Sequence, residues 1–547
     1  MINAASRFLE SAAIHSARPA LWLNEHPYSY AELAQYVSAL AQLLHDLPGA
    51  RCAVLGERSL TAYCAPLACL LAGKTYIPLG ASFPVERMQA ILTNAQAELL
   101  LADPTVESSL QALLSHLDTP LTVVRPEHEG NSDGLPAGHA SLDGLWQQLR
   151  PGSVSVLPQP LATADIAYLL YTSGSTGLPK GVMIGHGALD DYVSSVLQRY
   201  PELDPEQRCS QFFEPTFDLS LHDMFVTWAA GACLYSIPKK ELFLPLDFVR
   251  RHEITVWFSV PSLLATLVRY RQLTPNCVPS LRLALFCGEA LPVALALQWM
   301  QAAPQARCEN LYGPTEATIA CTAWRMSAAE TGAVVPIGQA FPSMEIAVLD
   351  ENGVPAAPGQ AGELYLGGSQ LALGYWNDPA QTARRFVTRD VPPYRSTRWY
   401  RSGDLALLDE TGIAHFRGRV DRQVKVRGYR IELQDVEAHL RQICATTEVA
   451  VLALPPLPCG TIPGLAAFVV DPPQSAGTLL ACCRERLPAY MVPGAIHAVP
   501  ALPLNSNGKT DYGQLAQRLS ELLQQPDATR PLHASTRAPE MQVVAAG

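Results

Sequence analysis

Residues 171–183 combine glycines, hydroxyl side chains and a lysine within one short stretch, Tyr-Thr-Ser-Gly-Ser-Thr-Gly-Leu-Pro-Lys-Gly-Val-Met. Its glycines, Gly174, Gly177 and Gly181, let the backbone fold back on itself without Cβ clashes. Backbone N–H groups can then converge on an anion, together with the hydroxyls of four residues: Thr172, Ser173, Ser175 and Thr176. Lys180 adds a mobile positive charge. The stretch therefore predicts a loop that binds a polyphosphate.

The segments on either side of this loop indicate how it is held. Residues 165–171 form a short apolar run with aromatic residues, which predicts a buried strand. From Val182 onward the pattern is mixed and predicts the start of a helix. The spacing is not that of a Walker A motif, in which Gly-Lys is followed by Ser or Thr. A Ser/Gly linker is the alternative, but a linker seldom follows a buried strand directly.

Asp218 is the first of three acidic residues that could bind a ligand. It lies within the apolar segment 217–225, where a lone carboxylate is costly unless it is paired. It could cap a helix, or it could bind the ammonium group of a substrate.

Two further motifs follow predicted strands or turns. Residues 283–290 predict a buried strand that stops at Gly288, where a flat ligand could approach the backbone. In residues 310–316, a Gly-Pro turn presents Tyr312 for ring stacking, Thr315 as a hydroxyl donor and Glu316 as a carboxylate. Asp404 could accept hydrogen bonds from two vicinal hydroxyls. For each of these, an ordinary turn residue is the alternative interpretation.

Charged residues dominate 416–433, and a lysine follows a turn near the end of the chain. The charged stretch is compatible with a solvated turn and a protected edge strand. Lys509 follows Asn507-Gly508, a turn dipeptide that would place it at a loop tip. Most lysines at such tips have no catalytic role, so this lysine carries weight only with the motifs upstream.

Taken in order from about Tyr30 to Asp511, these motifs resemble those of the adenylate-forming superfamily, which includes acyl-CoA ligases, luciferases and peptide-synthetase adenylation domains. The resemblance implies a two-step ligase that uses ATP and Mg²⁺. It assigns adenine and nucleotide contacts to Gly288, Asn310 and Tyr312, the α-phosphate to Thr315, and magnesium to Glu316 with Thr176. These assignments suit Mg²⁺, which needs one or two carboxylates beside phosphate oxygens.

The same resemblance assigns roles in the remaining motifs. Asp404 matches the ribose aspartate, and Arg419 matches a residue near the ribose and phosphate. Asp421 falls at the family's hinge, and Gly428 would border the tunnel of an incoming thiol. Lys509 resembles the catalytic lysine of adenylation, which would neutralise charge at the pentavalent phosphorus without proton transfer.

Asp218 matches the aspartate that holds the α-amino group in amino-acid-activating members, so the resemblance implies an amino acid substrate. Alignment to the family's specificity positions lists the pocket: Asp218, Leu219, His222, Phe258, Leu285, Cys287, Leu311, Ile319 and Ala320. This lining is largely apolar, which implies a small or medium neutral amino acid, with proline as the first candidate. His222 departs from the usual bulky apolar residue, and a hydrogen bond from it to the substrate would favour serine, threonine or cysteine. The alternative is a half-buried histidine that only bonds its neighbours in the protein.

The chain of 547 residues is long enough for two or more domains. Alternating helical and strand-like segments in the first 150 residues predict a layered α/β fold. We expect a large N-terminal domain over 1–420, a small mobile α+β lid over 421–522 and a disordered tail over 523–547. No carrier motif follows, so we expect a stand-alone enzyme whose acceptor is the phosphopantetheine thiol of a separate carrier protein.

Composition excludes several other classes. The formal net charge of −11 argues against a nucleic-acid partner. The sequence shows neither a signal peptide nor an apolar run of membrane-spanning length. Its thirteen scattered cysteines lack zinc spacing, which favours reduced thiols in a cytoplasmic protein. Two alternatives remain: an acyl-CoA or amide-forming ligase of the same superfamily, and a non-catalytic nucleotide-binding protein.

Overall fold

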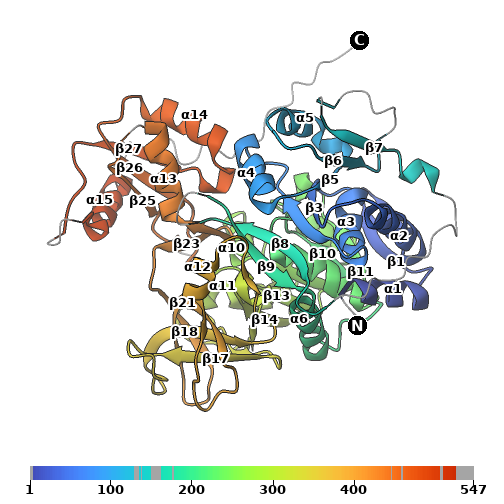
Figure 1. Ribbon diagram of the computed structural model, residues 1–547. Coiled ribbons are helices and arrows are strands. Elements are labelled where there is room, and N and C mark those ends of the chain that lie inside the picture. Colours follow the sequence, from blue (N-terminus) through green and yellow to red (C-terminus); the bar gives the residue numbers. More distant parts are fainter. Residues whose placement is uncertain are drawn as a thin grey trace, which may run out of the picture. The chain divides into compact units, whose positions relative to one another are not determined.

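The computed structural model describes residues 4–128, 135–136, 138–149, 162–174, 178–444, 446–457, 460–505 and 509–524. The chain divides into two compact units (Figure 1). The first comprises Met1–Thr172 and Pro179–Asp421, and the second comprises Ser173–Leu178 and Arg422–Gly547. The predicted combination of a large N-terminal domain and a small C-terminal domain, both mixed α/β, is confirmed.

One sheet of the first unit holds the predicted phosphate loop. Its strand order is β19-β9-β8-β4-β3-β5-β6-β7. The bounds are β3 Arg51–Leu55, β4 Thr75–Leu79, β5 Leu99–Ala102, β6 Thr122–Arg125, β7 Ala140–Asp143, β8 Ile166–Thr172, β9 Lys180–Gly185 and β19 Gly374–Tyr375. From β7 to β8 all pairs are parallel, whereas β8 pairs antiparallel with β9, and β9 with β19. Apolar runs such as Leu99–Ala102, fully buried, suit the inner strands of a parallel sheet.

A second, larger sheet carries the predicted amino-acid pocket. Its order is β16-β15-β14-β13-β12-β10-β11-β1-β2. The bounds are β1 Pro19–Leu23, β2 His26–Ser29, β10 Arg208–Gln211, β11 Cys233–Ser236, β12 Val256–Ser259, β13 Leu283–Phe286, β14 Arg307–Tyr312, β15 Thr322–Arg325 and β16 Gln339–Ala340. Strands β12, β13 and β14 are parallel, so their carboxyl ends lie at one edge of the sheet.

Helices cover these two sheets. Their bounds are α1 Ala4–Ile14, α2 Tyr30–Asp46, α3 Leu60–Leu71, α4 Val85–Ala95, α5 Glu107–Ser115, α6 His186–Arg199, α7 Asp218–Leu221, α8 Thr227–Ala229, α9 Leu246–Arg251, α10 Pro261–Arg269, α11 Val293–Ala302 and α12 Pro379–Arg385. Helix α2 begins with a capping box, because Ser29 and Glu32 bond each other's backbone N–H groups. Helices α1, α2 and α3 pack together.

The rest of the first unit is a five-stranded antiparallel sheet that positions Asp404 and Arg419. The order is β17-β18-β21-β20, with β22 paired to β21. The bounds are β17 Met344–Leu349, β18 Ala361–Gly368, β20 Phe386–Thr388, β21 Arg398–Leu408 and β22 Ala414–Arg419. In the β21–β22 register, Asp404 lies opposite Arg419.

The second unit contains two small sheets and three α-helices among its described residues. Its elements are β23 Gln423–Val426, β24 Tyr429–Glu432, α13 Leu433–Cys444, β25 Val449–Ala453, β26 Leu465–Val470, α14 Ala476–Arg486, β27 Ala495–Val499 and α15 Tyr512–Gln524. Strands β25, β26 and β27 form one sheet, with α13 and α14 on one core and α15 on another. Residues 525–547, most of the predicted tail, lie outside the described residues.

One local prediction was wrong. Residues from Val182 do not begin a helix: Lys180–Gly185 forms strand β9, and helix α6 begins at His186. Residues 180–185 form a strand because they pair with β8 on one side and on the other with β19, almost two hundred residues further along the chain.

Candidate active site

The predicted phosphate loop closes a hairpin. Thr172 at the end of β8 lies opposite Lys180 at the start of β9. The hydroxyl of Thr172 is buried and has no hydrogen-bond partner among the described residues. Such an orphaned group is costly, which fits a position that a bound ligand completes. Ser175, Thr176 and Gly177 lie outside the described residues.

Lys180 and Glu316 form a buried ion pair beside the hairpin. Lys180 Nζ lies 3.7 Å from Glu316 Oε1, and the Glu316 side chain is fully buried. The Tyr375 hydroxyl donates to the same oxygen at 2.8 Å, and Lys180 Nζ lies 5.0 Å from the centroid of the Tyr375 ring. A carboxylate this deep needs both a cation and a hydrogen bond, and two strands of the sheet, β9 and β19, supply them.

Glu316 also has the chemistry expected of a magnesium ligand. Mg²⁺ usually keeps several waters and binds one or two carboxylates together with substrate phosphates. One buried carboxylate beside a phosphate loop fits that pattern. Among the described residues, no group of three or more acidic, histidine or cysteine side chains could hold a metal by itself, so such an ion would depend on the substrate's phosphates.

Asp404 is held by two donors. The Tyr312 hydroxyl donates to its Oδ2, and Arg419 Nη1 donates to its Oδ1. Arg419 also binds Asp421 through both carboxylate oxygens, at 2.7 and 2.9 Å. Burial, reinforced by the charge of Asp404, raises the pKa of Tyr312 above its ordinary value, so its hydroxyl stays protonated and can donate. The arrangement orients the Asp404 carboxylate, which suits the predicted contact to ribose hydroxyls.

The predicted adenine residues lie where β13 and β14 end. Gly288 follows β13 with φ +94°, a backbone conformation that favours glycine. Asn310 in β14 donates from Nδ2 to the Pro336 carbonyl at 2.8 Å. Its Oδ1 is buried and has no hydrogen-bond partner among the described residues. An acceptor left in this state at the carboxyl end of a parallel sheet suits a ligand that donates a hydrogen bond.

Thr315 and the loop after it are strained. Thr315 begins a short 3₁₀ turn that ends at Ala317. Thr318 and Ile319 then have φ values of +52° and +71°, which β-branched residues rarely adopt. The loop is closed by the Cys321 N–H, which donates to the Tyr312 carbonyl at 2.8 Å. Such unfavourable backbone conformations persist only where the surrounding contacts hold them in place, and they are most common at functional sites.

Sheet register brings four pocket residues onto one face. Phe258 lies opposite Leu285, and Leu285 lies opposite Glu309. Because side chains alternate along a strand, Cys287 and Leu311, two residues further on, share that face. Ile319 and Ala320 follow on the strained loop, and Leu219 belongs to the same apolar cluster. These side chains are all buried, so the sequence alignment identifies a connected apolar region.

His222 is neutral and fixed by a tyrosine. Its Nδ1 lies 2.7 Å from the Tyr192 hydroxyl, and its ring centroid lies 4.3 Å from that of Phe258. Burial lowers the pKa of His222 to about 3. The buried Tyr192 hydroxyl can donate to Nδ1, which places the ring proton on Nε2. No hydrogen-bond partner of Nε2 is found among the described residues.

Asp218 begins helix α7, followed by a π-helical turn over His222–Val226. Burial, as the largest cause, and the charge of Asp218, as a smaller one, raise the pKa of Tyr168 and of Tyr192. A carboxylate in the first turn of a helix is favoured by the helix dipole. The next residue, Leu219, belongs to the apolar cluster that includes Phe258, Leu285 and Leu311.

The second unit holds the remaining predicted residues. Gly428 has φ +83° and, with Arg427, makes the two-residue turn of the β23–β24 hairpin. Lys509 N donates to Asn505 Oδ1 at 3.0 Å. Ser173, which groups with this unit as does Gly174, donates to the Arg430 carbonyl at 3.0 Å. Asp421 is the last residue of the first unit.

Two contributors were missed by sequence reasoning. Tyr375 lies in strand β19, within the Gly-Tyr-Trp stretch 374–376, and nothing local to it indicates a contact with Glu316. Tyr192 lies on helix α6, where its apolar neighbours indicate a core position. In both cases the partner is distant in sequence, 59 and 30 residues away.

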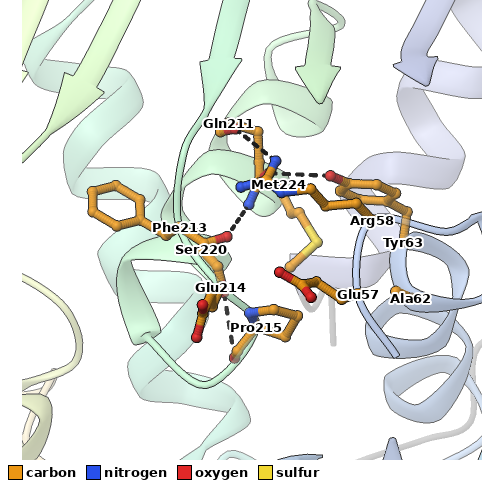
Figure 2. A pocket seen from close by; sticks show the side chains of 10 residues that line it. All are labelled: Glu57, Arg58, Ala62, Tyr63, Gln211, Phe213, Glu214, Pro215, Ser220 and Met224. Carbon is orange, nitrogen blue, oxygen red and sulfur yellow. Dashed lines mark hydrogen bonds between the residues drawn. The ribbon is translucent and has the colours of Figure 1, made fainter. Parts of the chain in front are cut away.

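A further small pocket lies outside the predicted site residues (Figure 2). It is lined by Glu57, Arg58, Ala62, Tyr63, Gln211, Phe213, Glu214, Pro215, Ser220 and Met224, and none of these is a predicted site residue. Arg58 donates to Gln211 Oε1 at 2.7 Å and to the Phe212 carbonyl at 2.7 Å, and Tyr63 also donates to Gln211 (Figure 2). These polar groups bind each other, so we do not place the substrate here.

Comparisons with known proteins agree with this geometry. A family model described as AMP-binding enzyme matches residues 8–376, and one described as AMP-binding enzyme C-terminal domain matches residues 435–509. An L-proline–[L-prolyl-carrier protein] ligase of Streptomyces coelicolor is 35% identical over 522 residues, which cover 92% of this chain and 94% of the relative. A protein of the same name from Pseudomonas fluorescens is 31% identical, covering 94% and 98%.

A solved structure is also similar. The Vibrio cholerae adenylation domain AlmE, crystallised with glycyl-adenosine-5'-phosphate, superimposes with a TM-score of 0.85 at 34% identity, covering 95% of this chain and 98% of that one. A helix long and apolar enough to cross a membrane is not found in the part of the chain that the structure describes.

Proposed function

The chain belongs to the AMP-binding enzyme family, and on that premise we propose that it activates a small or medium neutral amino acid as aminoacyl-AMP and transfers it to a separate carrier protein. The observation that carries the proposal is Asp218, a buried carboxylate at the start of a helix beside an apolar sheet face. An acidic anchor suits the α-ammonium group, and the apolar face suits a neutral side chain. The carrier-protein ligases named above support the same reaction.

In the first step a carboxylate oxygen of the amino acid attacks the α-phosphorus of ATP, a P–O bond forms, and the bond to the leaving pyrophosphate breaks. Lys180 and the hydroxyls of the 171–183 loop bind the phosphates, and Thr315 binds the α-phosphate. Asp404 orients the ribose, held by Tyr312 and Arg419. Lys509 adds positive charge as the phosphorus becomes pentavalent. Positioning and electrostatics supply most of the catalysis in such phosphorus chemistry.

Mg²⁺, held by Glu316 and Thr176 with the phosphate oxygens, would neutralise charge on the triphosphate. The protein's contribution is to keep the Glu316 carboxylate ionised and oriented, through Lys180 and Tyr375.

In the second step the phosphopantetheine thiol of the carrier attacks the carbonyl carbon of the adenylate. A C–S bond forms, AMP leaves, and the thiol proton is lost. We propose residues 1–420 as the catalytic core and 421–522 as a lid that turns about Asp421. The lid would present Lys509 in the first step and the turn at Gly428 in the second.

Proline is the first candidate among substrates. The four pocket residues Phe258, Leu285, Cys287 and Leu311 are buried and uncharged, and relatives that share 35% and 31% of the sequence are named for proline. His222 supports a second candidate set, because its Nε2–H would bond the oxygen or sulfur of serine, threonine or cysteine.

Amino-acid-dependent pyrophosphate exchange, run over a panel of amino acids and of acids without an amine, tests the proposal. We expect exchange with a small neutral amino acid. Exchange confined to amine-free acids would instead support an acyl-CoA or amide-forming ligase. No exchange with any acid would support a non-catalytic nucleotide-binding protein.

Lys509→Ala tests whether Lys509 acts in catalysis of adenylate formation and not in ATP binding. We expect adenylate formation to fall by at least about 1,000-fold, since electrostatic stabilisation of a transition state contributes on this scale. ATP binding, measured by calorimetry, should change by less than about threefold, since the phosphates are bound elsewhere. Retained adenylation in this variant would remove Lys509 from the mechanism.

A further inference from the structure

A buried carboxylate in the second unit joins the parts of the chain around Lys509. Glu437 lies on α13 and is 2% exposed. Its Oε1 accepts hydrogen bonds from Arg422 Nη2 at 2.9 Å, from Val451 N at 2.9 Å and from the Tyr512 hydroxyl at 3.2 Å. Arg441 Nη2 lies 3.4 Å from Oε2. A buried charge is stable in such a setting because it is paired and hydrogen-bonded.

Arg422 and Tyr512 also contact each other directly. The Arg422 Cζ lies 3.4 Å from the centroid of the Tyr512 ring, a stacked cation–π arrangement. Arg422 Nη2 also donates to the Val451 carbonyl at 2.6 Å. Burial, with the charge of Glu437, raises the pKa of Tyr512, so its hydroxyl remains a donor. The Tyr512 ring, the Glu437 carboxylate and the Val451 carbonyl therefore fix the Arg422 guanidinium group.

The turn that carries Lys509 ends at Tyr512. The Asn505 N–H donates to the Lys509 carbonyl at 2.7 Å, and the Asp511 N–H donates to the Pro503 carbonyl at 2.7 Å. The Asp511 carboxylate accepts from the Gln514 N–H at 3.0 Å, as an N-cap does for helix α15. The base of the turn thus continues without a break into the residue that stacks on Arg422.

We propose that Arg422, Glu437 and Tyr512 are positioning residues that tie the base of the Lys509 turn to the residue that follows the proposed hinge. This inference rests on the proposed function. A catalytic lysine on a turn loses much of its effect when it is misplaced by about 1 Å. With the three residues in place, Arg422 and the turn move as one body, so reorientation at Asp421 carries Lys509 with it.

A merely structural role for these residues makes a different prediction. The network also packs α13 against β25, and its loss would then lower the activity of the whole unit. Positioning instead predicts an effect confined to the step that uses Lys509. The first and second half-reactions separate the two cases, because a supplied aminoacyl adenylate bypasses the first.

Tyr512→Ala is the decisive variant, since it removes both the ring and the hydroxyl. We expect kcat for pyrophosphate exchange to fall about 10- to 100-fold, with KM values for ATP and amino acid changed by less than about twofold. Thioester formation from freshly prepared aminoacyl adenylate and holo-carrier should stay within about twofold. In a Lys509→Ala background, Tyr512→Ala should cause no further loss, because residues acting as a unit are non-additive.

Two further variants keep the test sound. Tyr512→Phe retains the stack on Arg422 and should lose less than about threefold in exchange. Leu440→Ala, a core position on the same helix, matches the loss of stability and should affect both half-reactions alike. If Tyr512→Ala does not fold, Arg422→Gln replaces it, with the same expectations.

Equal loss in both half-reactions for Tyr512→Ala, or a further loss on top of Lys509→Ala, would overturn the inference. A wild-type protein that exchanges with no amino acid would instead overturn the proposed function, so the two failures are distinguishable.

Discussion

The nucleotide side and the amino-acid side of the first unit solve the problem of buried charge differently. On the nucleotide side, Glu316 has Lys180 and Asp404 has Arg419, so the protein supplies a cation for each carboxylate. On the amino-acid side, Asp218 is buried at the start of α7, the next residue belongs to the apolar cluster of the sheet, and His222 is neutral. The first arrangement pairs each carboxylate with a cation of the protein, whereas we propose that the second pairs with the ammonium group of the substrate.

This difference predicts the largest effect for Asp218. We expect Asp218→Asn to lower kcat/KM for the amino acid by about 100- to 1,000-fold, the scale for losing one partner of a buried charge pair. KM for ATP should change by less than about twofold, and thermal stability should hold. Steady-state pyrophosphate exchange measures both constants.

Asp223→Asn is the matched control. Asp223 lies on the same helix, is 3% exposed, and burial raises its pKa well above the ordinary value, so the change is nearly isosteric and neutral. An equal loss of kcat/KM in the two variants would mean that Asp218 only supports the helix.

The nucleotide side should respond in stability as well as activity. Lys180→Met leaves Glu316 buried without its cation, and we expect the free energy of unfolding to fall by about 3 kcal/mol, less than for a fully isolated charge because the Tyr375 hydrogen bond remains. Adding Glu316→Gln should restore most of that stability but no activity. Urea unfolding, read beside exchange, measures the pair; a double variant no more stable than Lys180→Met would contradict it.

The smallest effect concerns pH and His222. A histidine whose pKa is lower in the folded than in the unfolded protein contributes stability above about pH 6.5. This stability is lost as pH falls, because the histidine is protonated in the unfolded protein but stays neutral in the folded one. Burial sets the folded pKa at about 3. Between pH 7 and pH 5 the loss should be about 2 kcal/mol smaller in His222→Gln than in the wild type.

Tyr192→Phe retains the histidine and serves as the control for this measurement, since it should keep the wild-type pH dependence. Identical pH dependence in His222→Gln and the wild type would show that His222 is accessible to protons in the folded protein.

Much of the fold was predictable because its signals are local. The capping box at Ser29 and Glu32, the apolar run 99–102 and the Arg427-Gly428 turn each depend on neighbours within a few residues. Strand β9 was not predictable from local sequence, because its second partner is β19, far along the chain. A short mixed segment has no intrinsic preference strong enough to decide between helix and strand.

The candidate site shows the same limit. Family resemblance located the carboxylates and lysines, and the comparisons confirm the family. The roles of the individual residues stay predictions. The tyrosines that orient them, Tyr192, Tyr312 and Tyr375, act through contacts between distant segments, which a single sequence does not encode in its spacing.

The π-helical turn at His222–Val226 separates α7, which carries Asp218, from α8, which packs in the core. After the turn, Trp228 in α8 fixes the helix, because its indole N–H donates to the Ala20 carbonyl at 3.0 Å. Before the turn, α7 carries Asp218, and His222 is the first residue of the turn itself. Deleting one residue within the turn would restore regular winding and rotate α7 by about 100° against α8. The widened turn is thus a place where a one-codon change could redirect selectivity while leaving the scaffold intact.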